Sequence, residues 1–205
     1  MDTRIGFGWD SHAFKPGVPL RIGGLTLKHP EGLAGHSDGD VLLHAITDAL
    51  LGAVAAGDIG SFFPPGDPRW KDADSAIFLN LAVEELQNAG YRIVNIDTTL
   101  VLAAPKIIPV AGEMRARVAD LLGIDIDQVS IKAKTPEGLN LDHVAQCHAI
   151  VLVERVREAD ELASMSAVIE TQRQLEDVVE DLLSTVHGVP KKRTLPSVYD
   201  TEDIT

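Results

Sequence analysis

Two short stretches near the amino terminus combine carboxylates and imidazoles at spacings that suit a metal ion. In Asp10-Ser11-His12 the acid and the histidine are two positions apart, so in an extended chain both side chains point to the same side. In the second stretch, His36–Asp40 (HSDGD), the acid Asp40 is followed one helical turn later by His44. Asp10, His12 and His44 would give a three-ligand site with an open position, which is the arrangement of a catalytic rather than a structural zinc.

Each stretch also has an ordinary structural interpretation. An acid and a histidine two positions apart occur in many turns, and a lone histidine on the edge of an apolar helix face is usually a core residue with a hydrogen-bond partner. The clustering of His12, His36 and His44 near acids favours the metal site. We expect Asp40 or Asp48 to orient a ligand imidazole from behind. The same ligands would also accept manganese, cobalt or another divalent transition metal.

Three later segments place polar residues where ligands of α/β proteins often bind. Asp58 and Gly60 lie in a glycine-rich loop, and the carboxylate can accept hydrogen bonds from sugar hydroxyls. Residues 104–106 (APK) and 132–137 (KAKTPE) follow predicted strands, and ligands collect at strand ends. In the second of these, Lys134 and Thr135 suit a phosphate and Glu137 suits a divalent cation. The alternative for each segment is a solvated loop.

The elements that must position these residues follow from hydrophobic periodicity. From residue 38 apolar residues recur at helical spacing, which predicts a helix with Ser37 or Asp38 as its N-cap and Gly57 as its end. Gly23-Gly24 between two short apolar runs predicts a hairpin, and residues 58–71 are expected to form a loop. Further helices are predicted at residues 73–88 and 109–122, and strands at residues 3–8, 20–22, 25–27, 91–103, 128–134 and 146–156. This order predicts an α/β fold, an α+β sandwich in which helices pack on one face of a mixed β-sheet.

The pattern changes after residue 156. Seven positions follow a heptad spacing, and six of them are apolar: Met165, Val168, Gln172, Leu175, Val179, Leu182 and Val186. This spacing predicts a C-terminal amphipathic helix over residues 157–187 with a coiled-coil seam. Residues 188–205, with two prolines and mixed charge, are expected to be a disordered tail. Residues 1–156 would then form the main domain.

The overall charge and composition exclude several classes of protein. The formal net charge of the 205 residues is −13, which argues against nucleic acid or an anionic membrane surface as the main partner. No apolar run approaches the roughly 20 residues that span a bilayer, and the first residues lack the basic and apolar regions of a signal peptide. The single cysteine, Cys147, excludes an internal disulfide. We therefore expect a cytoplasmic protein.

Five segments together resemble the 2-C-methyl-D-erythritol 2,4-cyclodiphosphate synthase family of the non-mevalonate isoprenoid pathway. The order and spacing are similar to the family across residues 4–154. The segments are RIGFGWDSHAF (4–14), GLAGHSDGDVLLHAITDALLGAVAAGDIGSFFP (32–64), ADS (73–75), APKIIP (104–109) and IKAKTPEGL (131–139).

The resemblance implies a reaction and an assembly. In 4-diphosphocytidyl-2-C-methyl-D-erythritol 2-phosphate, the 2-phosphate attacks the β-phosphorus of the diphosphate. CMP leaves, and 2-C-methyl-D-erythritol 2,4-cyclodiphosphate forms without a covalent enzyme intermediate. Catalysis then consists of positioning and charge stabilisation, with divalent metals neutralising the phosphoryl oxygens. The family is a homotrimer with sites between subunits.

The resemblance also implies a role for each matching residue. Asp10, His12 and His44 match the zinc ligands, and Glu137 matches the ligand of a second metal, magnesium or manganese. His36 and Thr135 are the expected catalytic residues, since they match groups beside the reacting phosphates. The substrate-binding residues implied by the match are Asp10, His12, His36, Ser37, Asp58, Gly60, Ala104, Pro105, Lys106, Lys134 and Thr135.

Three departures from the family pattern keep a second hypothesis open. Lys134 and Pro136 flank Thr135 where the family has further threonines, and Pro65 replaces an aspartate, with Asp67 nearby as a substitute. Residues 140–147 are shorter than in the family and contain no arginine, which removes the residue thought to hold isoprenoid diphosphates in a central trimer cavity. The alternative function is therefore a non-catalytic or altered-substrate trimeric zinc-binding relative that binds another phosphate ligand or a protein partner.

Overall fold

A five-stranded mixed sheet carries the candidate site. The computed structural model describes residues 2–187, with side chains for residues 2–157 and 168–183. The strand order is β4-β1-β7-β5-β6, and every neighbouring pair is antiparallel except β5 and β6, which run parallel. The strands are β1 (Thr3–Pro16), β4 (Glu31–Leu33), β5 (Tyr91–Val101), β6 (Val129–Lys134) and β7 (Val144–Arg155). The hairpin of β2 (Leu20–Ile22) and β3 (Leu25–Leu27) forms a separate two-stranded sheet, as predicted.

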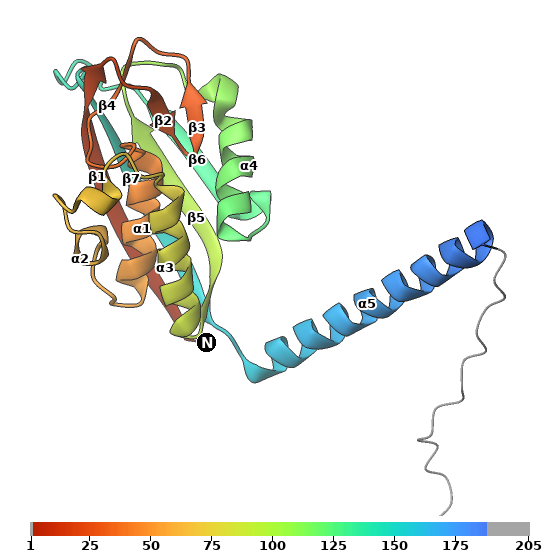
Figure 1. Ribbon diagram of the computed structural model, residues 1–205. Coiled ribbons are helices and arrows are strands. Elements are labelled where there is room, and N and C mark those ends of the chain that lie inside the picture. Colours follow the sequence, from red (N-terminus) through yellow and green to blue (C-terminus); the bar gives the residue numbers. More distant parts are fainter. Residues whose placement is uncertain (1, 188–205) are drawn as a thin grey trace, which may run out of the picture. The chain divides into compact units, whose positions relative to one another are not determined.

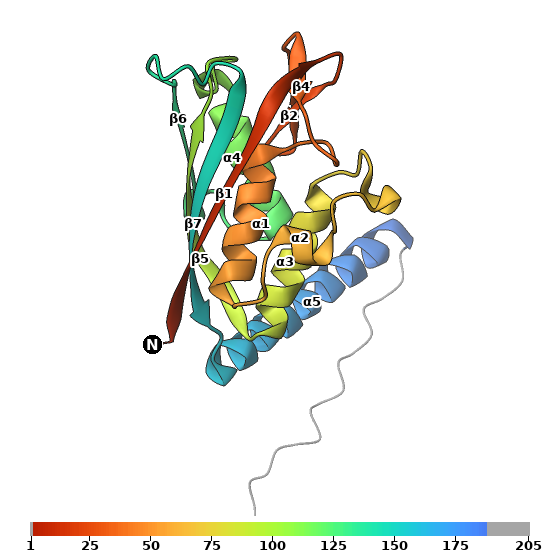
Figure 2. The ribbon, with the colours of Figure 1, turned by 90° about the vertical axis from the view of Figure 1, so that its left-hand side faces the viewer.

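Within residues 2–156 the longer helices lie on one face of the sheet, which confirms the predicted fold class (Figures 1 and 2). Their apolar stripes and the inward side chains of the strands form one buried core. The helices of this part are α1 (Val41–Ala53), α2 (Ile59–Phe62), α3 (Ala76–Asn88) and α4 (Ala111–Leu122), with short 3₁₀ turns at Pro68–Trp70, Ile108–Val110 and Ile126–Gln128.

Several predicted boundaries were wrong. Strand β1 does not end at residue 8, because β7 pairs with it residue by residue as far as Ala13. The loop predicted for residues 58–71 contains α2 and a 3₁₀ turn, and the short strand β4 was not predicted. Helix α1 begins at Val41 with Asp40 as its N-cap, not Ser37 or Asp38, and ends at Ala53 rather than Gly57.

The carboxylate of Asp40, the N-cap of α1, connects the start of the helix to the β2–β3 hairpin. It accepts hydrogen bonds from the backbone N–H groups of Leu42 and Leu43 in the first helical turn, and from those of Gly23 and Gly24 in the hairpin turn. The side chain is fully buried. The hairpin therefore fixes where α1 begins.

Two glycines of β1 allow α1 to pack unusually close to the sheet. A Cβ atom at Gly8 would lie 2.0 Å from the backbone oxygen of Ala45, and one at Gly6 would lie 1.8 Å from that of Ala49. Asp10 and His12 continue the same alternation along β1, so their side chains point to the face that α1 covers. The close approach thus brings the first turn of α1, with His44, against Asp10 and His12.

Replacing Gly8 by alanine is therefore expected to destabilise the fold by about 3 kcal/mol, because backbone atoms rather than a flexible side chain block the new methyl group. Urea unfolding followed by circular dichroism measures the change. The matched control is Gly112→Ala in α4, where a new Cβ would meet no atom within 4 Å beyond its chain neighbours and the backbone of its own helix. That change should stabilise the protein by about 0.5 kcal/mol. Equal stability of Gly8→Ala and the parent chain would contradict the packing argument.

The chain divides into two compact units, Met1–Val156 and Arg157–Thr205, and the second is described by itself. It contains α5 (Glu158–His187), in agreement with the helix predicted over residues 157–187. The tail predicted to be disordered, residues 188–205, lies outside the described residues. Among the residues that the structure describes, no helix combines the length and the apolar character needed to cross a membrane.

Candidate metal centre and phosphate site

Asp10 and His12 of β1 and His44 of α1 converge on one point. Asp10 Oδ2 lies 2.8 Å from His12 Nε2 and 3.0 Å from His44 Nδ1, and the two imidazole nitrogens are 3.1 Å apart. His44 is buried, and the other two residues are partly exposed, so the cluster is open on one side. The structure thus brings together the three residues that the sequence singled out, as a group that could hold a metal ion.

The spacing of the three ligand atoms fits a single tetrahedral ion. Zinc bonds of about 2.0–2.2 Å would place tetrahedral ligand atoms roughly 3.3 Å apart, a few tenths of an ångström more than the observed distances. Two imidazoles and a carboxylate are the ligand types that zinc and related transition metals prefer.

The electrostatics of the cluster also favour a cation. Burial by itself would raise the pKa of Asp10, but the contacts with His12 and His44 outweigh it and hold that pKa well below its usual value. Burial would lower the pKa of His12, yet the adjacent Asp10 carboxylate outweighs burial and raises it. Asp10 therefore remains an anion at the centre of a half-buried site.

The expectation that Asp40 or Asp48 orients a ligand imidazole was wrong. Asp40 is engaged as the N-cap of α1, and Asp48 accepts a hydrogen bond from the backbone N–H of Ile59. Instead, Nε2 of His44 faces two hydroxyls, Ser75 Oγ at 2.8 Å and Ser37 Oγ at 3.1 Å. Sequence reasoning missed Ser75 because it is 31 residues from His44, and only its place in the ADS segment marked it.

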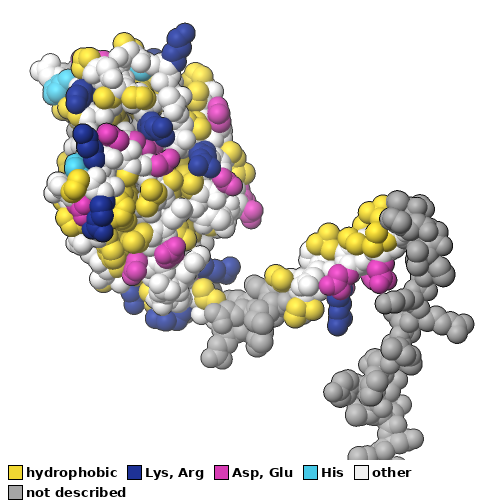
Figure 3. All heavy atoms as spheres, viewed as in Figure 1, with side chains coloured by type: hydrophobic (Ala, Val, Ile, Leu, Met, Phe, Trp, Pro, Cys, Tyr) yellow, Lys and Arg dark blue, Asp and Glu magenta, His cyan; other side chains and the backbone are white. Residues whose placement is uncertain are grey.

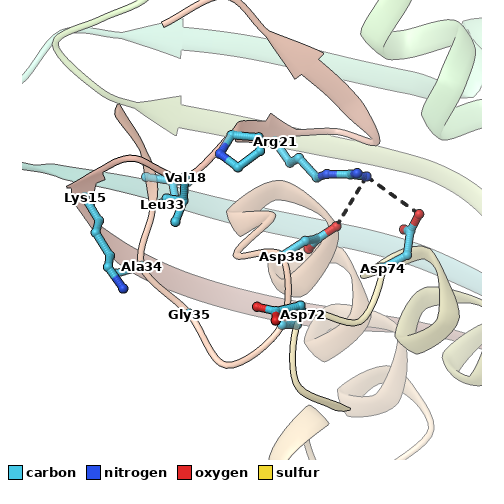
Figure 4. Close-up of a pocket in the computed structure, with 11 residues that line it drawn as sticks. Lys15, Val18, Arg21, Leu33, Ala34, Gly35, Asp38, Asp72 and Asp74 are labelled. Atoms are coloured by element: carbon cyan, nitrogen blue, oxygen red, sulfur yellow. Dashed lines mark ion pairs between the residues drawn. The ribbon is translucent and has the colours of Figure 1, made fainter. Parts of the chain in front are cut away.

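His36 and Ser37 lie in the loop that leads into α1, beside the metal cluster. His36 Nε2 lies 2.9 Å from the backbone oxygen of Asp67. Ser37 helps to line an open cavity of about 310 Å³, together with Lys15 and Arg21 (Figure 4). This loop therefore borders a hollow large enough for a small polar ligand.

The segment after α1 is held by aromatic packing. The ring centroid of Phe63 lies 4.8 Å from that of Trp70 and 4.3 Å from that of Phe78 in α3.

Two acids of this segment already have partners within the chain. Asp58 caps α2, which contains Gly60, by accepting hydrogen bonds from the N–H and hydroxyl of Ser61. The carboxylate of Asp67 forms an ion pair with Arg69 at 2.6 Å, so the proposed substitute for Pro65 already has a partner.

A second cavity, of about 240 Å³, lies at the ends of β5 and β6. It is lined by ten residues, Leu102, Ala103, Pro105, Lys106, Ile107, Ile108, Ala133, Lys134, Thr135 and Glu137, and Ala104 precedes Pro105 through a cis peptide bond. The Thr135 hydroxyl donates a hydrogen bond to Glu137. Glu137 has a φ of 51°, a left-handed conformation that is uncommon for a residue other than glycine and often marks a functional site.

The candidate residues therefore form two separate groups on one chain. Strand β7 lies between β1, which carries Asp10 and His12, and β5, which leads to the second cavity. Neighbouring strands are about 4.8 Å apart. Among the residues that the structure describes, the two cavities share no lining residue.

Comparisons with known proteins were consistent with one another. The YgbB family model matches residues 3–154. A 2-C-methyl-D-erythritol 2,4-cyclodiphosphate synthase of Koribacter versatilis (strain Ellin345) is 62% identical over 152 residues, which cover 74% of this chain and 98% of that protein. Two solved structures of 2C-methyl-D-erythritol-2,4-cyclodiphosphate synthase, one of them the CDP-bound form, are 40% and 38% identical. Each has a TM-score of 0.70 and is matched over 74% of this chain and 100% of its own.

The matched region contains both groups of candidate residues and stops before α5. High identity, nearly complete coverage of the relatives and a common fold all point to the same family. The chain belongs to the YgbB family, the family of 2-C-methyl-D-erythritol 2,4-cyclodiphosphate synthases.

Proposed function

We propose that the protein is an active, metal-dependent phosphorus–oxygen lyase. It converts 4-diphosphocytidyl-2-C-methyl-D-erythritol 2-phosphate to 2-C-methyl-D-erythritol 2,4-cyclodiphosphate and CMP in non-mevalonate isoprenoid synthesis. The convergence of Asp10, His12 and His44 on one point, in a chain 62% identical to a synthase of that name, is the observation that carries the proposal. The free, buried Cys147 suits a reducing compartment, so we also propose a cytoplasmic location.

The proposed roles follow the two groups of residues. In the first group, Asp10, His12 and His44 would hold zinc, while His36 and Ser37 orient the substrate beside that site. Asp58 and Gly60 contact the hydroxyls of the methylerythritol part of the substrate. When bound, the metal supplies Lewis acidity that neutralises charge on phosphoryl oxygens.

The second group holds the nucleotide end of the substrate. Ala104, Pro105 and Lys106 form the wall of the cytidine pocket. Lys134 and Thr135 bind phosphate oxygens, and Glu137 would hold a magnesium or manganese ion, which would neutralise diphosphate charge. Because the reaction forms and breaks only phosphorus–oxygen bonds, fixing the 2-phosphate in line with the leaving CMP is the main task of these side chains.

We propose that the site is completed between subunits of a homotrimer. The sheet face opposite the helices supports self-association, because it presents large apolar side chains to solvent: Ile5 is 70% exposed, Phe7 60%, Trp9 48% and Ile150 48%. The separation of the two groups of residues supports a shared site, since a second copy can bring its nucleotide half to the metal half of the first.

The second hypothesis is a relative that retains the site but has lost the reaction. Pro65, Lys134 and the short 140–147 segment motivate it. Calorimetric titration with CDP, combined with an assay of CMP release from the cytidyl substrate, separates the two hypotheses. The synthase binds CDP and releases CMP when zinc and magnesium are supplied. A metal-loaded protein that binds CDP but releases no CMP is the altered relative.

We further propose that α5 of each subunit packs against α5 of the others. In the described part of the helix, residues 168–183, hydrophobic side chains gather mainly along one side and acidic ones along the other (Figure 3). The described seam residues are largely exposed, with Val168 at 65%, Leu175 at 60%, Val179 at 51% and Leu182 at 59%. A heptad seam is buried in a coiled coil, where the polar Gln172 would help fix the register. The alternative is a solvated, partly frayed acidic helix.

Truncation after residue 156 is expected to lower the thermal midpoint, because the buried seam would be lost, and to loosen the trimer. Differential scanning calorimetry and sedimentation velocity measure these two effects. A finer test compares Leu175→Glu on the seam with Gln174→Glu beside it, which adds the same charge outside the seam. Only the first should destabilise the assembly. If truncation leaves both the trimer mass and the thermal midpoint unchanged, α5 is not part of the assembly.

A further inference from the structure

A chain of hydrogen bonds lies behind His44, on the side away from Asp10 and His12. Ser75 Oγ is 2.8 Å from His44 Nε2 and 2.5 Å from Asp38 Oδ1. Ser75 is completely buried just before α3, and only 10% of the Asp38 side chain is exposed. The chain joins three segments that are distant in sequence, and none of the roles proposed above uses Ser75 or Asp38.

The donors and acceptors fix the direction of this chain. A carboxylate can only accept hydrogen bonds, so the single hydroxyl hydrogen of Ser75 is donated to Asp38. The lone pairs of Ser75 Oγ remain for His44, so the hydrogen bond between these two residues is one that His44 Nε2 donates. Ser37 Oγ, 3.1 Å from the same nitrogen, can accept the same hydrogen.

A neutral imidazole carries one ring hydrogen, so His44 Nδ1 then keeps its lone pair. The hydrogen bond that Asp10 Oδ2 accepts in the cluster must come from His12 Nε2, 2.8 Å away, rather than from His44 Nδ1 at 3.0 Å.

Asp38 is itself held in place by further donors. Its Oδ1 accepts a hydrogen bond from the N–H of Asp40 at 3.2 Å, and its Oδ2 accepts one from the N–H of Ser75 at 3.3 Å. Arg21 lies between Asp38 and Asp74, with Nη1 at 3.9 and 3.8 Å from their carboxylates (Figure 4). These contacts hold the carboxylate of Asp38 in place beside Ser75.

We propose that Asp38 and Ser75 are positioning residues that fix the ring hydrogen of His44 on Nε2. The free lone pair on Nδ1 then points at Asp10 and His12, where the metal of the proposed function would bind. The expected effect on metal binding rests on the proposed function. The position of the ring hydrogen does not, because it can be measured in the protein without metal. Groups that hold the far nitrogen of a ligand histidine typically change metal affinity by about 10- to 100-fold.

The first test is the tautomer of His44 in the metal-free protein. Long-range ¹H–¹⁵N correlation spectra of the full chain, recorded where the imidazole is neutral, distinguish a protonated from an unprotonated ring nitrogen. We expect His44 to be protonated on Nε2. In Asp38→Asn the side-chain amide can donate to Ser75, which reverses the chain, so the form protonated on Nδ1 should appear. A wild-type His44 protonated on Nδ1 would overturn the proposal.

The second test is the affinity for Co²⁺, measured by competition with a chelator. Ser75→Ala and Asp38→Asn should each weaken cobalt binding by about 10- to 100-fold, and Ser75→Thr, which keeps the hydroxyl, should restore most of it. The matched control is Thr98→Val, because Thr98 is also buried and donates a hydrogen bond, but in β5. Unchanged affinity in both Ser75→Ala and Asp38→Asn would overturn the proposal.

The two readouts separate this inference from the proposed function. A wild-type protein that binds no cobalt would remove the metal site but leave the tautomer experiment decisive for Asp38 and Ser75. Thermal melting shows whether each variant is folded. If Ser75→Ala does not fold because its site is buried, Asp38→Asn, which lies in a loop, supplies both measurements.

Discussion

Replacing His44 by alanine is expected to remove most bound zinc and to lower CMP release by at least about 10³-fold, because a lost metal removes several kcal/mol of charge stabilisation. Among the described residues, His44 contributes one of the three ligand atoms of the cluster, and Asp10 and His12 alone leave a two-ligand site. The fold should be retained, since alanine is the best helix former and His44 lies in the first turn of α1.

Elemental analysis of the purified variant and a CMP-release assay check this prediction together. The control is His29→Ala, which removes a half-buried histidine whose ring contacts Phe14 and the backbone of Glu31 outside the cluster. That control should keep its zinc and its activity. Unchanged zinc content in His44→Ala would exclude His44 as a ligand.

Changing Glu137 to glutamine is expected to lower turnover by about 10²-fold at low magnesium, with partial recovery at high magnesium. The amide has the same size but lacks the charge that a hard divalent cation requires. Zinc content should not change, because Glu137 lies at the second cavity. Steady-state kinetics across a magnesium series measure the effect. Glu113→Gln, an exposed acid in the first turn of α4, is the matched control. An unchanged magnesium dependence would contradict the proposed role of Glu137.

The same two variants test whether the site is shared between subunits. When His44→Ala and Glu137→Gln chains are coexpressed, about a quarter of the sites should combine an intact metal half with an intact nucleotide half from another chain. Activity should therefore return to roughly that fraction of the wild type, although each variant alone is nearly inactive. Mixed assemblies without activity would place both halves in one chain.

Much of the fold could be predicted because the sequence patterns are local. The Gly23-Gly24 turn predicted the hairpin, and heptad spacing predicted α5. The extension of β1 through Asp10 and His12 could not be predicted, because polar residues there resemble a loop and only pairing with β7 keeps them extended. The N-cap at Asp40 was missed for a similar reason, since half of its hydrogen-bond partners come from the hairpin.

The candidate site also has a part that local spacing predicts and a part that depends on long-range contacts. The two-residue spacing of Asp10 and His12 predicts a common face without any knowledge of the fold. The approach of His44 depends on backbone contact between α1 and the glycines of β1, which no local pattern contains. Ser75 is a further example, because its place in the site depends on a hydrogen bond with His44, which is 31 residues away in the chain.

The most direct test of the proposed function is a ³¹P NMR time course. The full-length protein, loaded with zinc and supplied with magnesium, is incubated with 4-diphosphocytidyl-2-C-methyl-D-erythritol 2-phosphate. We expect the substrate phosphorus signals to be replaced by those of CMP and of a cyclic diphosphate in equal amounts. Unchanged substrate signals, with zinc bound and CDP binding intact, would contradict it.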